Sequence, residues 1–263
     1  FTVGSDNHVN GSYNYVSYNW KGGATTSGTT SGSGTNKPYS ANYNTDAGFS
    51  IVNFEGNGSS GHTIPHHLNK APDVIILKRR DNNNNWAVGM NPYMNNYGWN
   101  GAMKLDNLET WAGDNRWANT APTNSVFTVS SDASTNANGG DHTAYCWHDV
   151  DGYSKFGAFK AVGDYDNNVF VYTGFRPAWI MVKNFQANGS SWLVSDNKRN
   201  ITNDGAMTNS WAEGHYAENP NDYGYDFLSN GFKMRNTSQN VAASYYYFYM
   251  AFAEQPFKYT NAR

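Results

Sequence analysis

Two long stretches of this chain repeat the same landmarks in the same order. Residues 48–90 begin GFSIVNFEG, and residues 155–196 begin KFGAFKAVG. Five landmarks recur with an offset of 104 to 106 residues: Pro72 and Pro177, Lys78 and Lys183, Trp86 and Trp192, Gly101 and Gly205, Phe127 and Phe232. Chance explains five ordered coincidences poorly, so we interpret residues 46–150 and 151–253 as two copies of one structural unit, followed by a C-terminal tail at 254–263.

The spacing of these units restricts the fold class. A period near 105 residues is too long for a solenoid repeat of about 20 to 50 residues, and it fits a tandem array of independent β-sandwich domains. Aromatic residues make up 16% of the chain and charged residues only 15%, with 26 Gly, which favours strands joined by many turns. We therefore predict an all-β fold of jelly-roll or lectin-like sandwiches. Because the join at 148–155 is short, the two units should lie close together.

Apolar runs indicate where the strands lie. In the second unit we predict strands near 156–162, 168–173, 178–184, 191–195, 205–208, 231–235 and 244–252. The continuous runs VIILK (74–78) and WIMVK (179–183) are typical of central strands that are covered on both faces, and so is YYYFYMAF (245–252).

The first 45 residues fit neither unit. Residues 1–20 resemble only the end of a unit, so they are either the end of an upstream repeat or a strand pair that completes the first sheet. Residues 21–45 are rich in Gly, Ser and Thr. This composition favours a flexible linker, and the alternative is an ordered insertion that pairs with a neighbouring chain.

Several function classes lack support in the sequence. The net charge is −3 without a block of Lys or Arg, so we expect no nucleic-acid partner, and no run of about 18 apolar residues predicts a membrane span. We find no nucleophile elbow, phosphate loop, dinucleotide fingerprint or metal-ligand motif, and the single Cys146 cannot form an internal disulfide. We therefore expect no catalytic residues, no metal and no cofactor.

Aromatic residues within polar loops are the candidate ligand-binding residues. Sugar rings stack on such side chains, and amides and carboxylates bind their hydroxyl groups. The same rings could instead cap the sandwich cores or contact a neighbouring subunit. The candidates for glycan stacking are Tyr97, Trp99, Trp111, Trp117, Trp211, Tyr216 and Tyr223.

Several blocks resemble a known group of proteins. TDAGFSIVNFEGNGSSGHTIPHHLNKAPDVIILKRR, NTAPTNSVFTVSSD, HTAYCWHDVDGYSKFGAF, VYTGFRPAWIMVK, YDFLSNGFKMR and YMAFAEQPFKYTNAR are similar to predicted tail-fibre and other virion structural proteins of tailed phages, especially marine ones. The resemblance covers most of residues 45–263. It implies a β-rich, non-enzymatic domain on the surface of an extracellular virion, and it assigns no binding residues.

The resemblance and the aromatic loops together predict a tail-fibre or appendage component that recognises host-surface glycans. Phage fibres are usually trimers, so we expect a homotrimer in contact with other virion proteins. The alternatives are a capsid or tail decoration protein without a ligand, a secreted carbohydrate-binding module, and a polysaccharide-cleaving enzyme that uses two of Glu55, Glu109, Glu213 and Glu218.

Overall fold

The fold is almost entirely β-structure. The computed structural model describes residues 2–12, 15–91, 97–164, 167–199, 203, 208–214, 218, 224–235 and 244–255. Strands account for 43% of the chain and helices for 3%, so the prediction of an all-β sandwich fold is confirmed. The strands form four antiparallel sheets, beside two four-residue helices, α1 (Asn7–Asn10) and α2 (Ala133–Asn136).

The first sandwich consists of two sheets. Its inner sheet has seven strands, in the order β1 (Ala24–Thr29), β3 (Pro38–Asn44), β4 (Phe49–Glu55), β10 (Asp141–Trp147), β6 (Val74–Arg79), β7 (Ala87–Met90) and β8 (Met103–Lys104). Its outer sheet has three, in the order β2 (Ser31–Gly32), β5 (His62–Pro65) and β9 (Val126–Val129).

The second sandwich has the same plan. Its inner sheet has the order β11 (Ser154–Lys160), β18 (Tyr246–Ala253), β13 (Pro177–Asn184), β14 (Trp192–Asp196) and β15 (Ser210–Trp211). Its outer sheet has the order β12 (Phe170–Tyr172), β17 (Gly231–Met234) and β16 (Tyr225–Leu228). The strand order β4-β10-β6-β7-β8 therefore corresponds to β11-β18-β13-β14-β15. The unit boundaries at residues 46, 150 and 253 stay a prediction.

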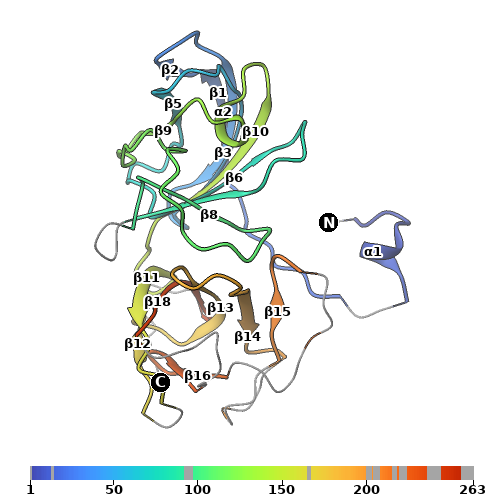
Figure 1. Cartoon of the computed structure of the whole chain (residues 1–263). Helices are drawn as coiled ribbons and strands as arrows, with labels where there is room; N and C mark the ends of the chain where they lie inside the picture. Colours follow the sequence, from blue (N-terminus) through green and yellow to red (C-terminus); the bar gives the residue numbers. More distant parts are fainter. Residues whose placement is uncertain are drawn as a thin grey trace.

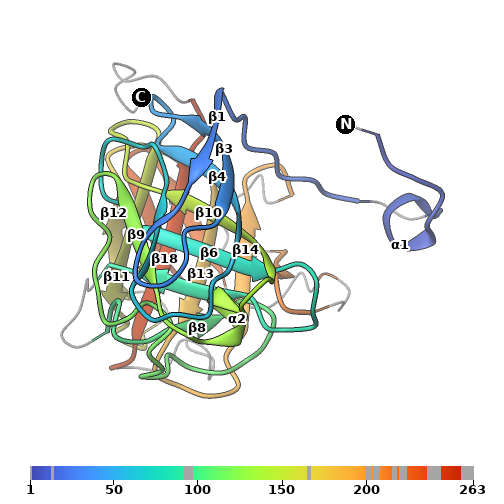
Figure 2. The same cartoon turned by 90° about the horizontal axis from the view of Figure 1, so that it is seen from above.

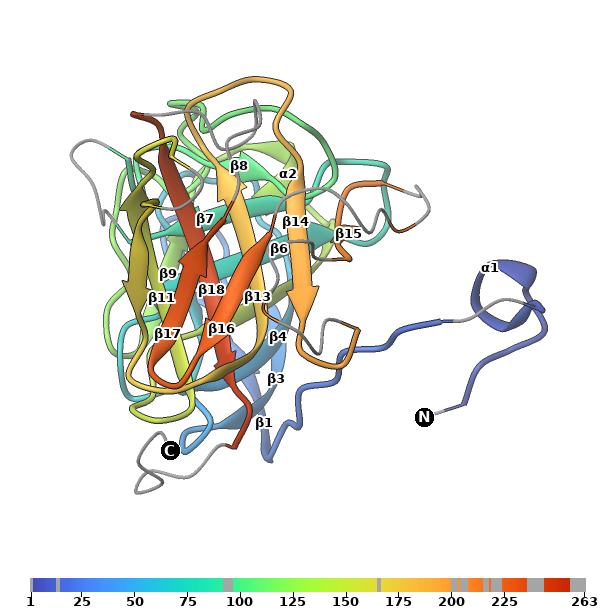
Figure 3. The same cartoon turned by 90° about the horizontal axis from the view of Figure 1, so that it is seen from below.

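The four sheets stack as four layers, with the inner sheets face to face in the middle (Figure 1). The strands of the two inner sheets cross at a large angle (Figure 2). From below, β14 and β18 lie in front of the first sandwich (Figure 3). Each outer sheet packs on the remaining face of its inner sheet, so the central strands of both inner sheets are covered on two sides.

The core between the inner sheets belongs to both sandwiches. Val74, Ile76 and Trp147 of the first inner sheet pack with Met181 and Phe248 of the second in one buried cluster, which we call the shared core. The two units do lie close together, as the short join predicts. The expectation of independent domains is wrong, because each unit would expose its half of this apolar cluster to water if it stood alone.

Burial on both faces explains the continuous apolar runs. Along β18 the side chains alternate between two cores, with Phe248 and Met250 in the shared core and Tyr247 and Tyr249 in the core under the second outer sheet. Strands β6 and β13 are likewise buried over most of their length. The prediction of central strands covered on both faces is therefore confirmed.

The segment interpreted as a flexible linker forms ordered β-structure. Strands β1 and β3 form a hairpin, and β3 pairs with β4 from Tyr39 to Asn44, which adds two strands to the first inner sheet. The linker interpretation is wrong here, because alternating Tyr, Ala and Thr side chains bury one face of the hairpin, with Ala41 in the first outer core. The hairpin pairs with its own sheet. Pairing with a neighbouring chain stays a prediction.

A buried polar network fixes the turn of this hairpin. His62, fully buried, lies 2.9 Å from Asn136 Oδ1 and 2.6 Å from Thr30 Oγ1. The Nδ2 group of Asn57 donates to the carbonyl oxygens of Ser33 and Thr35. These bonds connect the turn of the hairpin to the outer sheet and α2, and the pairing of β3 with β4 connects its strands to the inner sheet.

Residues 2–12, which include α1, lie away from the body of the molecule (Figure 1), whereas Tyr18 and Trp20 pack against it. Trp20 lies 6.0 Å from the Trp147 ring and 5.7 Å from the Trp179 ring, so it contacts both sandwiches. The described residues of this segment contain α1 and no strand. The alternative of a strand pair that completes the first sheet is therefore wrong, and an upstream repeat stays a prediction.

Candidate functional site

The hairpin carries one face of the first inner sheet past the area that the second sandwich covers. Residues directly opposite each other in antiparallel strands project on the same side of the sheet. Four consecutive strand pairings therefore align one row of polar side chains across five strands: Ser27, Ser40, Asn53, Thr143 and Lys78. A parallel row contains Thr25, Asn42, Ile51 and Tyr145. We call the surface formed by these nine residues the open polar face.

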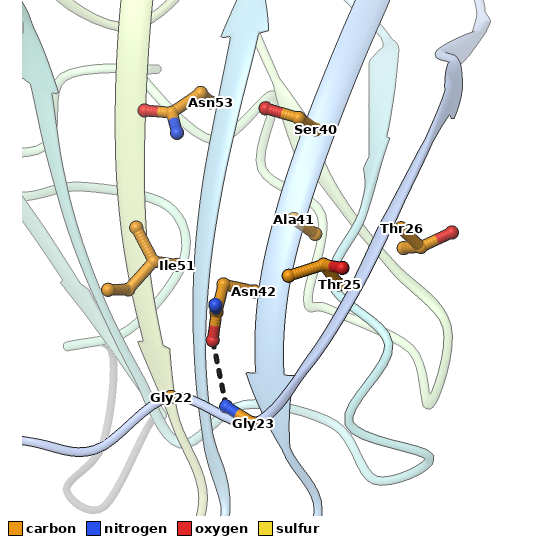
Figure 4. Close-up of a pocket in the computed structure, with 9 residues that line it drawn as sticks. All are labelled: Gly22, Gly23, Thr25, Thr26, Ser40, Ala41, Asn42, Ile51 and Asn53. Atoms are coloured by element: carbon orange, nitrogen blue, oxygen red, sulfur yellow. Dashed lines mark hydrogen bonds between the residues drawn. The ribbon is translucent and has the colours of Figure 1, made fainter.

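The open polar face contains a cavity. Its volume is about 520 Å³, and its lining is mostly hydroxyl and amide side chains: Gly22, Gly23, Thr25, Thr26, Ser40, Ala41, Asn42, Ile51 and Asn53 (Figure 4). The Asn42 Oδ1 atom accepts a 2.8 Å hydrogen bond from the Gly23 amide. A Cβ atom on Gly22 would lie 1.8 Å from the same oxygen, so only glycine permits this close approach.

Aromatic side chains border the face on the side of β10 and β6. The Tyr145 ring lies 6.3 Å from the Trp86 ring at an interplanar angle of 22°. The Lys78 ammonium lies 5.8 Å from the centre of the Trp86 ring. All three side chains are partly exposed, so they offer a ring surface and a hydrogen-bond donor next to the hydroxyl and amide groups.

Charges at the far rim of the face are paired. Lys37 Nζ lies 2.6 Å from Glu55 Oε1, and Arg80 Nη2 lies 3.9 Å from Asp141 Oδ2. The rim therefore carries opposite charges in equal number. A neutral polar ligand meets no strong net field there.

The second sandwich carries different residues at two of these positions. Asn53 pairs with Thr143 and Thr143 with Lys78 in the first inner sheet. In the second inner sheet the corresponding row is Ala158, Phe248 and Lys183. Phe248 and Lys183 are fully buried, and burial lowers the pKa of Lys183 to about 8. The row is thus apolar apart from lysine in the second sandwich, and in the first it carries the half-buried amide of Asn53 and the buried hydroxyl of Thr143.

The residues predicted for glycan stacking do not form one platform. Trp99 and Trp117 are buried in the first outer core, 5.6 Å apart in an edge-to-face contact. The glycan-stacking interpretation is wrong for these two residues, because buried rings offer no face to a ligand. Their positions fit the alternative that the rings fill the sandwich core.

The other predicted rings are scattered. Tyr97 and Trp111 lie at the junction of the sandwiches, where both pack against the shared core, and the Tyr97 hydroxyl accepts a bond from Gln186. Trp211 is a half-buried residue of the edge strand β15, opposite Leu193. For these three, sugar contact stays a prediction. Tyr216 and Tyr223 lie outside the described residues.

The carboxylates proposed for catalysis contact separate groups. Glu55 binds Lys37, Glu109 binds Lys104, Glu213 accepts from the Trp192 amide, and Glu218 binds Arg199. Within the described ranges, no three His, Cys, Asp or Glu side chains gather to hold a metal ion. In the same ranges, no helix is long and apolar enough to cross a membrane.

The geometry defines an all-β protein with two stacked sandwiches and one open polar sheet face. The chain belongs to the family described as "Domain of unknown function (DUF7483)", whose sequence profile matches residues 1–256. Comparison with curated proteins and with solved structures gives no significant match.

Proposed function

We propose that this protein is a non-enzymatic structural module of a phage virion appendage, such as a tail fibre, and that it binds host-surface glycan at the open polar face. One observation carries the binding proposal. Where the second sandwich has Ala158 and Phe248, the first has the half-buried Asn53 and the buried Thr143, whose hydroxyl donates to Asn53 Oδ1 at 2.6 Å and so holds the amide beside the exposed Ser40. The similarity of several sequence blocks to virion proteins supports the location on the particle surface.

The chemistry of the face suits a neutral glycan. Hydroxyl groups of Ser40 and Thr25 and the amides of Asn42 and Asn53 provide donors and acceptors spaced over three strands, β1, β3 and β4. Hydroxyl and amide groups exchange hydrogen bonds with sugar hydroxyls, and the ring faces of Tyr145 and Trp86 suit the apolar faces of sugar rings. A shallow site of this type binds weakly by itself, and several copies on one particle would give avidity.

A glycan array tests this proposal. We expect the folded chain to bind a subset of glycans, and the double variant Ser40→Ala, Asn53→Ala to lose about tenfold or more of the affinity, since two hydrogen-bonding groups are removed. The matched control is Thr128→Ala, a half-buried threonine of β9 in the first outer sheet, which should bind as the unmodified chain does.

Two outcomes would count against the proposal. Silence of the folded chain across a broad array would favour a decoration protein without a ligand. Binding that survives the double variant unchanged would place the site on another surface, with the Tyr97, Trp111 and Trp211 rings as the next candidates.

A further inference from the structure

Strand β1 is an open sheet edge without the usual protection. It is the outermost strand of the first inner sheet, and no described strand lies beyond it. All of its residues except the half-buried Thr26 are exposed. Its sequence, ATTSGT, contains no charge and no proline. Exposed edges normally carry lysine, proline or a bulge, because their free backbone groups otherwise pair with another chain.

The direction of the free backbone groups follows from the pairing with β3. The Thr30 amide donates to the Lys37 carbonyl oxygen at 2.8 Å. Hydrogen-bonded residues alternate along an antiparallel pair, so Gly28, Thr26 and Ala24 also direct their backbone groups toward β3. The N–H and C=O groups of Thr25, Ser27 and Thr29 consequently point away from the sheet.

The other edges of the inner sheets differ from β1. Strand β11, at the edge of the second inner sheet, carries Lys155 and Lys160. Strands β8 and β15, at the two remaining edges, have only two residues each. Among these edges, β1 alone is both long enough to pair and free of charge.

The edge is also complementary to itself. If two copies of β1 run antiparallel with Ser27 opposite Ser27, then Thr25 of each copy lies opposite Thr29 of the other. Thr and Ser pairs of this kind stabilise antiparallel sheets, and the branched Thr26 meets Gly28, which has no side chain to clash. Three outward residues per copy give about six backbone hydrogen bonds.

We propose that β1 pairs with β1 of a second copy of this chain about a two-fold axis at Ser27, which gives a homodimer with one continuous fourteen-stranded sheet. The contact is closed, because the same edge is used on both sides. The side chains of Thr25 and Ser27 belong to the open polar face, so the faces of the two copies join into one surface. A homotrimer would need a different contact.

Sedimentation velocity of the full chain over a range of concentrations tests the proposal. We expect a reversible equilibrium between monomer and dimer. Ser27→Pro removes the outward N–H at the centre of the contact and leaves the bonds to β3 in place, so it should give monomer only. Ser27→Ala keeps the N–H group and should keep the dimer, which makes it the matched control.

A second variant covers the case in which Ser27→Pro does not fold. Ser27→Lys places two ammonium groups opposite each other at the axis, so the dimer should weaken at low salt and recover partly at high salt. A monomer at every concentration, or any oligomer that both variants leave unchanged, would overturn the proposal. Sedimentation velocity needs no glycan, so a failure of the dimer proposal can be distinguished from a failure of the binding proposal.

Discussion

Replacing Phe248 by alanine is expected to destabilise both sandwiches together and to lower the free energy of unfolding by about 3–5 kcal/mol. Phe248 is fully buried in the shared core, where its ring lies 6.2 Å from the Trp192 ring. Removing the ring leaves a cavity between the inner sheets. The first sandwich loses stability as well, because its residues in the shared core are shielded from water only by the second sandwich.

Hydrogen exchange resolved along the chain measures whether the destabilisation extends from the second sandwich to the first. In Phe248→Ala, amides of β6 in the first sandwich should lose as much protection as amides of β18. Phe127→Ala, in the core under the first outer sheet, is the reciprocal control, and it should lower protection in β13. Two separate unfolding transitions, with β6 unaffected by Phe248→Ala, would contradict a shared core.

Acid is expected to destabilise the fold between about pH 6.5 and pH 4 through two buried histidines. Burial lowers the pKa values of His66 and His142 to about 4, from 6.5 in the unfolded chain. The Leu68 amide donates to Nδ1 of His66, which therefore lies in its neutral form. Nδ1 of His142 lies 2.9 Å from the Gly140 carbonyl oxygen.

The direction of the change in stability with pH follows from proton binding. Below pH 6.5 the unfolded chain takes up protons that the folded chain refuses until about pH 4, so stability is complete above pH 6.5 and falls across this window. Each histidine accounts for about 3 kcal/mol at the acid end. Urea unfolding at a series of pH values measures the slope. His142→Phe should reduce this slope by less than half, because burial also lowers the pKa values of His62 and His148, and an unchanged slope would contradict the assignment.

The sequence predicts the inner strands well because their pattern is strong. The predicted strand at 178–184 is observed as β13 (Pro177–Asn184), and that at 244–252 as β18 (Tyr246–Ala253). Strand β16 (Tyr225–Leu228) was missed, because Asp226 interrupts a run of four residues. Of the strand predicted at 205–208, residues 205–207 lie outside the described residues, and the observed edge strand is β15 at Ser210–Trp211.

The site was harder to predict because side-chain composition does not show which sheet face stays open. Tryptophans in polar loops suggested ring stacking, yet Trp99 and Trp117 complete a core. A usable signal was present in SIVNFE and DHTAYCW, where Asn53 and Thr143 stand at positions that hold Ala158 and Phe248 in the second unit. The hairpin that extends this face was not predicted, because the Gly, Ser and Thr content of residues 21–45 is typical of a flexible linker.

The binding claim is tested most directly by nuclear magnetic resonance of the isotope-labelled full chain, titrated with the oligosaccharide that binds best on the array. We expect shifts to gather at the backbone amides of residues 25–27, 40–42, 51–53 and 143–145, and at the Ile51 methyl groups. Shifts confined to the surroundings of Tyr97, Trp111 or Trp211, with the open polar face unchanged, would contradict it.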